Sequence, residues 1–241
     1  AQSPLARVSA MNEIYKYRIK FTKVDKMRYI GHLDLLKYFQ RAIKRARVPI
    51  AYSTGFNPHQ LMSFATPLPL GMSSTRECVD IRLETPMECE ELKNALNAQM
   101  SLGMELTEVR RMAEGEDTGA ALLRAADHII TLDRKLENAD EMLKSLENDA
   151  EWLIEKVGKK KKVREVDIRP MVYELRAENA ESGENTKLFA RIATGSDQNL
   201  KVDLMLEYMY KKWGLEFDYL KIKVTRTGLY KEEESGEFTL L

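Results

Sequence analysis

Hydrophobic and polar residues alternate at the start of the chain, and then the spacing changes. Over residues 15–21 every second residue is apolar and the residues between are Lys or Arg, which is the period of a half-buried strand. Over residues 33–47 the apolar residues recur at three- and four-residue spacing, which predicts a helix with one buried face. Pro49 then ends this helix.

The same order of elements is predicted twice along the chain. In the first half, strands at 50–52 and 79–83, a helix at 88–100 and a strand at 104–112 follow the first strand and helix. The second half has a strand at 128–132, a helix at 139–157, strands at 165–178 and 187–194, a helix at 199–213 and a strand at 217–226. Each half therefore reads strand, helix, strand, strand, helix, strand. This order predicts an α+β fold of two tandem ferredoxin-like (βαββαβ) domains.

The domain boundaries follow from breaks in these patterns. The polar segment "GEDTG" is bounded by glycines and is the best linker in the chain. The predicted parts are linker or added residues at 1–13, a domain with a basic first helix at 14–114, the linker at 115–119, a second domain at 120–231 and a frayed tail at 232–241.

Composition excludes several classes of protein. The 241 residues carry 38 Lys plus Arg and 38 Asp plus Glu, so any attraction to an anionic partner must be local. Cys78 and Cys89 are the only cysteines, and their spacing argues against a disulfide scaffold, a metal site or an iron–sulfur cluster made by this chain alone. The sequence has no apolar run near 18 residues and no secretory leader. We therefore expect a cytoplasmic protein that does not engage a membrane.

Positive charge is concentrated on the first predicted helix. Residues 35–47 carry five cations and no acid, and Lys37, Arg41, Lys44 and Arg45 fall on one face. Such a stripe can neutralise phosphates, and a ferredoxin-like sheet is a common platform for single-stranded RNA. The alternative is a solvated face whose cations suit the helix dipole. A lysine tract at 158–162 adds a second basic spot.

His32 and the loop 53–60 lie on either side of this helix in the sequence. His32 is a candidate phosphate ligand or a general base toward a ribose 2′-hydroxyl, and the alternative is a capping or packing role. In the loop "STGFNPHQ", Gly, Asn and Pro favour an ordered turn. Phe56 could stack on a base, although pinning the loop to the core is the favoured role. The predicted RNA-binding residues are Arg28, Lys37, Arg41, Lys44, Arg45, Phe56, Asn57 and His59.

One long segment carries a family resemblance. The segment "MRYIGHLDLLKYFQRAIKRARVPIAYSTGFNPHQLMSFATPLPLG" closely resembles the opening block of the bacterial radical-SAM-linked domain of unknown function. "VDIRP" at 166–170 and "RTGLY" at 226–230 resemble its later blocks. The resemblance implies a radical SAM partner protein of the cobalamin-binding type and an RNA context. This chain lacks Cys-x-x-x-Cys-x-x-Cys, so the iron–sulfur cluster and S-adenosylmethionine are expected on the partner.

A second resemblance concerns catalysis. The doubled element order and the segment "GHLDL" are similar to the RAMP-superfamily CRISPR repeat-processing endoribonucleases, and this similarity implies that His32 is a catalytic base. The sequence departs from that family near its end, where "RTGLY" stands in place of a glycine-rich loop.

Three functions follow from these features. The leading hypothesis is an accessory RNA-binding module of a radical SAM enzyme, without catalytic activity of its own. The alternatives are a metal-independent endoribonuclease that uses His32 and an adaptor that binds protein alone.

Overall fold

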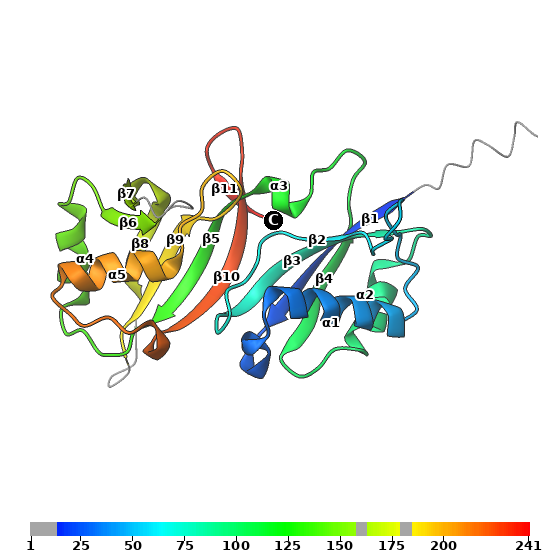
Figure 1. Ribbon diagram of the computed structural model, residues 1–241, viewed down its shortest axis with the longest axis horizontal. Helices are drawn as coiled ribbons and strands as arrows, with labels where there is room; N and C mark the ends of the chain where they lie inside the picture. The colour runs from blue at the N-terminus through cyan, green and yellow to red at the C-terminus, as the bar shows by residue number, and fades with distance from the viewer. Residues whose placement is uncertain (1–13, 158–162, 179–184) are drawn as a thin grey trace, which may run out of the picture. The chain divides into compact units, whose positions relative to one another are not determined.

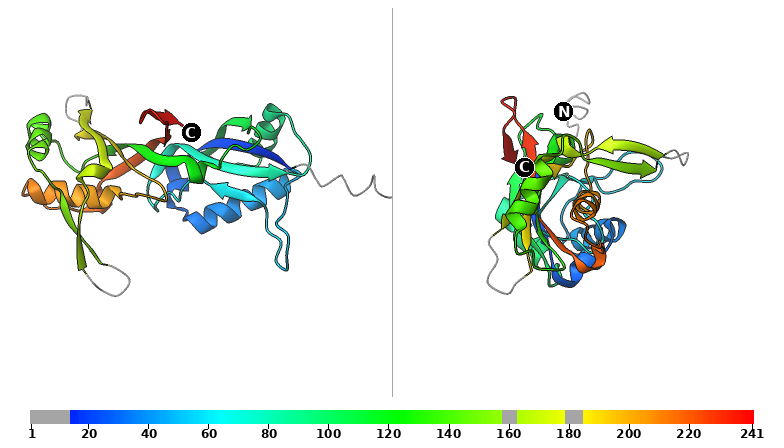
Figure 2. Two further views of the ribbon diagram at one scale, coloured as in Figure 1. Left: turned by 90° about the horizontal axis from the view of Figure 1, so that it is seen from above. Right: turned by 90° about the vertical axis from the view of Figure 1, so that its left-hand side faces the viewer.

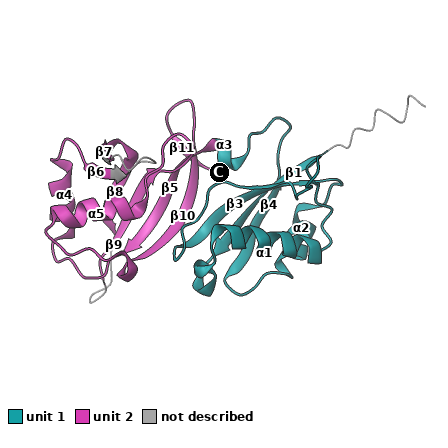
Figure 3. Cartoon of the chain, viewed as in Figure 1, with its two compact units in different colours: residues 1–121 teal, residues 122–241 magenta. Residues whose placement is uncertain are grey.

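The computed structural model describes residues 14–157, 163–178 and 185–241. The predicted linker at 1–13 and the lysine tract at 158–162 lie outside these residues. The chain forms two compact units, unit 1 over residues 1–121 and unit 2 over residues 122–241 (Figure 3). The division therefore falls just after the segment 115–119 that the sequence predicts as a linker. Overall, the structure is a mixed α/β fold.

Unit 1 contains four strands and two main helices (Figure 1). Its elements are β1 (Tyr15–Lys23), the 3₁₀ turn η2 (Asp25–Tyr29), α1 (His32–Arg45), β2 (Met62–Phe64), β3 (Ser73–Leu83), α2 (Cys89–Asn97), β4 (Met104–Arg111) and the short α3 (Gly119–Leu122). The strand order is β4-β1-β3-β2, and each neighbouring pair is antiparallel.

The core of unit 1 follows from the alternation in β1. Tyr17, Ile19 and Phe21 point to one face of the sheet and are at most 1% exposed. They share one hydrophobic cluster with Phe39 of α1 and Leu92 of α2. Fully burying a side chain of this size contributes roughly 1.5–3 kcal/mol, so this face fixes how both helices lie on the sheet. Arg18 and Lys20, which lie between these residues, are directed to the other face.

Helix α1 ends in a turn that places an arginine in an unusual conformation. Arg47 has φ 55°, in the left-handed region. The N–H of Arg47 donates to the carbonyl of Lys44, and the N–H of Val48 donates to the carbonyl of Ile43, both at 3.2 Å. This is a Schellman motif, in which glycine usually takes the position that Arg47 occupies.

Unit 2 contains one four-stranded antiparallel arrangement and a separate hairpin. Its elements are β5 (Leu123–Thr131), α4 (Ala139–Glu147), β6 (Leu153–Val157), β7 (Val163–Asp167), η3 (Arg169–Met171), β8 (Val172–Glu178), β9 (Lys187–Ala193), α5 (Val202–Lys212), η4 (Tyr219–Lys221), β10 (Lys223–Glu232) and β11 (Phe238–Leu240). The strand order is β10-β5-β9-β8, with β11 on β10 and with β6 and β7 paired to each other.

The helix predicted at 139–157 is too long. It ends at Glu147, and the chain then turns into β6. Trp152 determines the turn, because its buried indole Nε1–H donates to the carbonyl of Leu146 at 3.2 Å. Its backbone N–H donates to Oδ1 of Asp167 at 2.8 Å, which brings β6 alongside β7. Neither contact follows the three- and four-residue spacing of a helix, so the hydrophobic periodicity did not reveal them.

Four other predicted elements are corrected. The strand at 165–178 is two strands, because Pro170 lies in the intervening 3₁₀ turn and has no N–H for a ladder. The strand at 217–226 begins later, since residues 219–221 form η4. The tail at 232–241 is not frayed, because β11 pairs with β10 and Leu241 is buried. The strand at 50–52 is reduced to isolated bridges, and β2 forms in its place.

In the described part of the chain, no helix is long and apolar enough to cross a membrane.

Candidate nucleic-acid interface

The cations of α1 form a stripe on its exposed face. Lys37, Arg41 and Lys44 are all exposed, whereas Phe39 and Ile43 on the other face are fully buried. This arrangement follows from the helical period, because positions 37, 41 and 44 are four and three residues apart. We call these three residues the cationic stripe.

The cationic stripe has no internal counter-charge. Within the described ranges, no carboxylate lies within ion-pair distance of Lys37, Arg41 or Lys44. Arg45 differs from them, because its guanidinium donates to the side-chain oxygen of Gln99 at 3.1 Å and to the Gln99 carbonyl at 3.0 Å. Arg45 therefore links the end of α1 to the residues after α2 by hydrogen bonds. The other three predicted cations on this face remain available to an anionic ligand.

The loop 53–60 is closed by its own hydrogen bonds and attached to α1. Nδ1 of His59 lies 2.7 Å from Oγ of Ser53, and the backbone N–H of Ser53 donates to the His59 carbonyl at 2.9 Å. The Gln60 side-chain amide donates to the Gln40 carbonyl of α1 at 3.4 Å. The base of the loop therefore lies beside the half of α1 that carries Arg41 and Lys44, as the light-blue hairpin in Figure 2 shows.

Phe56 does not pin this loop to the core. Its side chain is 106% exposed, and Asn57 beside it is also exposed. Gly55 has φ 119°, which allows the tight turn that presents Phe56. The favoured interpretation from the sequence was therefore wrong, and the free aromatic ring is the arrangement that stacking on a base requires.

His32 lies at the opposite end of α1 from Arg41 and Lys44. It is the first residue of α1, and its half-buried ring packs edge-on against Phe64 with 5.5 Å between centroids. Its Nδ1 is buried and has no hydrogen-bond partner in the described part of the chain. Arg41 is nine positions further along the helix, roughly 13 Å at 1.5 Å per residue. The structure thus pairs His59 with Ser53 and holds His32 against β2.

Arg28 lies on η2 and is half-buried. Its guanidinium stacks over the ring of Tyr29, 4.7 Å from the centroid, and its Nε is buried without a described partner. Tyr29 is 60% exposed. Arg28 therefore stacks on an exposed aromatic ring, and no acidic side chain among the described residues pairs with its guanidinium.

The sequence analysis missed a polar network on the other face of the sheet. Arg18 is 2% exposed, and its guanidinium donates to both carboxylate oxygens of Asp80, at 2.8 and 3.0 Å. It also contacts Glu116 at 3.1 Å, and Arg110 donates to Glu116 at 2.9 Å. The hydrogen bond from Arg110 is the main reason that the pKa of Glu116 falls to about 2. The predicted linker is therefore packed on unit 1.

The cysteines do not fit a metal cluster. Burial and the neighbouring Asp80 carboxylate raise the pKa of the Cys78 thiol to about 12, which disfavours the thiolate that a metal requires. Cys89 is half-buried on α2. Among the described residues, no group of three His, Cys, Asp or Glu side chains is arranged to hold a metal ion.

The fold and the site define an α/β protein with an unpaired cationic helix and an exposed aromatic loop on one unit. Residues 16–202 match the bacterial family described as "Uncharacterized protein conserved in bacteria (DUF2344)". The match spans most of the chain, so the chain belongs to this family. Comparison with curated proteins gave no match.

Some solved structures are similar at low identity. One is a chain in the crystal structure of a Cbf5-Nop10-Gar1 complex, at 11% identity and TM-score 0.48, with 91% of this chain and 51% of that chain covered. Another is in the archaeal box H/ACA sRNP Nop10-Cbf5 complex, at 10% identity and TM-score 0.44, with 97% and 53% covered. This chain spans about half the length of both. TM-scores below 0.5 do not establish a shared fold or function.

Proposed function

We propose that this chain is an accessory module that binds single-stranded RNA along α1 and works with a radical SAM enzyme. The observation that carries the proposal is the cationic stripe of Lys37, Arg41 and Lys44. Like charges at this spacing repel one another, and the helix dipole favours only Lys44, which lies in the last turn. A phosphate backbone would neutralise them and release counterions, which makes the binding favourable at moderate salt.

The fold that we propose for both units is ferredoxin-like. In unit 1 a helix follows the first and third strands, and the order β4-β1-β3-β2 is antiparallel throughout. In unit 2 the order β10-β5-β9-β8 has the same pattern, with β6 and β7 added after α4. Ferredoxin-like sheets occur in several RNA-binding modules, where bases stack on the open face of the sheet. The surface proposed here is different, because it lies on α1, which packs on the core face.

Phe56 extends the proposed surface beyond charge. Its ring is exposed in the loop whose base Gln60 attaches to α1, so we propose that a base beside a bound phosphate stacks on it. Stacking of a base on an aromatic side chain contributes about 1–3 kcal/mol and does not depend on salt. The stripe and Phe56 would therefore make separable contributions to affinity.

The experiment measures the affinity of the full chain for a labelled single-stranded RNA of mixed sequence across a salt series. Arg41→Gln with Lys44→Gln removes two stripe charges and should lower the slope of log affinity against log salt by about 1.4. The matched control, Lys201→Gln with Lys223→Gln, removes two exposed charges from unit 2 and should leave the slope unchanged. Phe56→Ala should weaken binding at every salt concentration without changing the slope.

Three results would count against this proposal. Equal slopes in the stripe variant and the control would move binding away from α1. Absence of RNA binding at low salt, with co-purification of a partner that survives nuclease treatment, would favour the protein adaptor. Chelator-resistant cleavage of the RNA that His32→Ala abolishes would favour the endoribonuclease.

The radical SAM partnership rests on the sequence resemblance. The proposed partner would hold the iron–sulfur cluster and S-adenosylmethionine, since the cysteines of this chain do not suit a cluster. Co-expression with a radical SAM protein of the same bacterium, followed by size-exclusion chromatography with and without RNA, tests the partnership directly.

A further inference from the structure

Two cations face each other across neighbouring strands of unit 1. Lys16 of β1 and Arg82 of β3 are directly opposite in the antiparallel register. Like charges directly opposite each other destabilise a sheet, whereas opposite charges in the same position stabilise it. No ion pair joins either side chain to an acid among the residues that the structure describes. Among the described residues, therefore, no ion pair offsets the repulsion between these two cations.

The neighbouring carboxylate does not neutralise this pair. Asp80 lies two residues before Arg82 on the same strand, but Arg18 occupies both of its oxygens. The backbone N–H of Gly119 adds a third donor, 2.7 Å from Oδ2 of Asp80. Because Arg18 and Asp80 already balance each other, the positive charge of Lys16 and Arg82 remains uncompensated.

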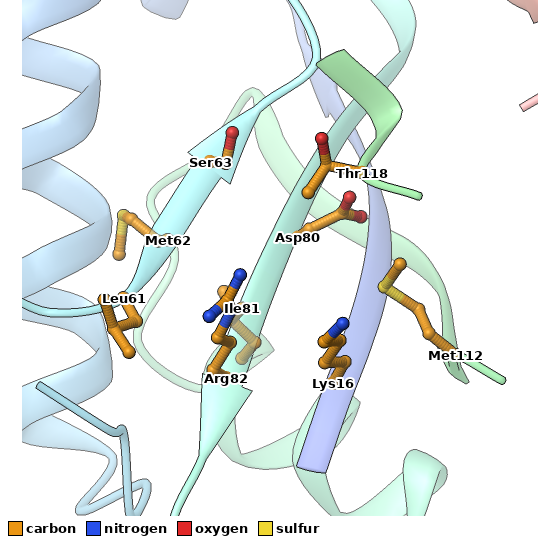
Figure 4. A pocket seen from close by; sticks show the side chains of 9 residues that line it. All are labelled: Lys16, Leu61, Met62, Ser63, Asp80, Ile81, Arg82, Met112 and Thr118. Atoms are coloured by element: carbon orange, nitrogen blue, oxygen red, sulfur yellow. The ribbon is translucent and has the colours of Figure 1, made fainter. Parts of the chain in front are cut away.

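Lys16 and Arg82 border a pocket with a cavity volume of about 140 Å³. Figure 4 shows both side chains on adjacent strands, with the hydroxyl groups of Ser63 and Thr118 further along the same pocket. The lining also includes the carboxylate of Asp80, which Arg18 neutralises, and apolar side chains such as Met112. Pockets for drug-sized ligands are about 300–1,000 Å³, so this one suits a small molecule or one chemical group.

We propose that this pocket binds the phosphate of a small phosphate monoester. Two cations match the charge of a phosphate dianion, and the planar fork of Arg82 can donate two parallel hydrogen bonds to phosphate oxygens. Ser63 and Thr118 supply further donors for the remaining oxygens, and the apolar wall accommodates a short organic group. A carboxylate would leave one of the two cations without a counter-charge.

This site differs from the proposed RNA surface. Lys16 alternates along β1 with Tyr17, whose side chain lies in the core beneath α1, so Lys16 is directed to the opposite face of the sheet. A terminal phosphate on RNA has the same chemistry as a free monoester, and the experiment must separate these two sources.

Thermal unfolding of the full chain at constant ionic strength tests the site with butyl phosphate as the probe. We expect a saturable rise in Tm, because a ligand that binds the folded state stabilises it by mass action. Lys16→Gln and Arg82→Gln should each weaken the apparent affinity at least tenfold. Arg76→Gln removes a charge from the same strand outside the pocket and should change the affinity less than twofold.

The unliganded variants separate a lost site from a damaged fold. Removing either cation relieves the repulsion, so Lys16→Gln and Arg82→Gln should match or exceed the Tm of the wild type without ligand. A variant that folds as well as the wild type and fails to respond to butyl phosphate supports the site. An equal response of wild type, both pocket variants and Arg76→Gln would indicate a general salt effect and overturn it.

Two further outcomes are decisive. A wild-type protein that shows no saturable response to butyl phosphate, but binds a 5′-phosphorylated trinucleotide and not its 5′-hydroxyl form, would overturn the small-molecule assignment. Binding of butyl phosphate that Arg41→Gln with Lys44→Gln leaves intact would support a pocket separate from the RNA surface, even if RNA binding itself is not found.

Discussion

The buried histidine of unit 2 should make that unit sensitive to mild acid. His128 lies in β5, 3% exposed, between Ala190 of β9 and Arg226 of β10. Burial, and then the positive charge of Arg226, lower its pKa from 6.5 to about 3. The folded protein therefore keeps this imidazole neutral at pH values where the unfolded chain binds a proton.

The sign and size of the change in stability follow from the linkage between proton binding and folding. Between pH 6.5 and pH 3 the unfolded state binds one more proton than the folded state at His128, so stability falls as the pH falls. The resulting loss is about 2 kcal/mol between pH 7 and pH 5, because each pH unit below 6.5 costs about 1.4 kcal/mol. The carboxyls of Glu116 and Asp133, with pKa values of about 2, contribute little in this window, since unfolded carboxyls titrate near pH 4.

Urea unfolding at several pH values between 7 and 5 measures this loss. Both tryptophans, Trp152 and Trp213, lie in unit 2, so intrinsic tryptophan fluorescence reports the unit that contains His128. His128→Gln removes the titrating group, and its unfolding free energy should vary much less with pH whatever its absolute stability. Equal pH dependence of wild type and variant would refute the argument, as would an NMR titration of His128 near pH 6.5.

Three other substitutions have defined outcomes. Arg47→Gly should raise the unfolding free energy by about 0.5–1 kcal/mol in urea titrations, because glycine adopts φ 55° without the steric cost that arginine carries. Arg18→Met should lower the stability of unit 1 by about 3–5 kcal/mol by calorimetry, since it leaves the Asp80 carboxylate buried without its partner. Phe56→Ala should leave the Tm within the error of the scan, because the ring contacts solvent alone.

The sequence predicted well those elements in which the spacing of hydrophobic residues alone shows which face is buried. The alternation at 15–21 and the helical spacing at 33–47 predicted β1 and α1 to within two residues, because one face of each is buried in the core. Where contacts outside the helical spacing decide the structure, the prediction was wrong. Trp152 ends α4 through contacts with Leu146 and Asp167, whereas the hydrophobic period alone predicted a helix that continues to residue 157.

The site was partly predictable for the same reason. Helical spacing placed Lys37, Arg41 and Lys44 on one exposed face, and the structure has them there. The role of Arg45 was not visible, because its partner Gln99 is 54 residues away in the sequence. Phe56 was assigned to the core because an aromatic side chain is more often buried, and the turn at Gly55 directs it into solvent instead.

The proposed surfaces of unit 1 follow from the distribution of ion pairs, which net charge conceals. The chain has equal numbers of acidic and basic residues, but only some of the basic residues of unit 1 have an acidic partner. Arg18 is neutralised by Asp80, and Lys20 lies 3.3 Å from Glu108, whereas Arg41 and Arg82 have no described acidic partner. Arg41 lies on α1 and Arg82 borders the pocket on the other face of the sheet. Since separated sites contribute additively, Arg82→Gln should leave the salt slope of RNA binding unchanged. A change in that slope would show that one ligand spans the cationic stripe and the pocket.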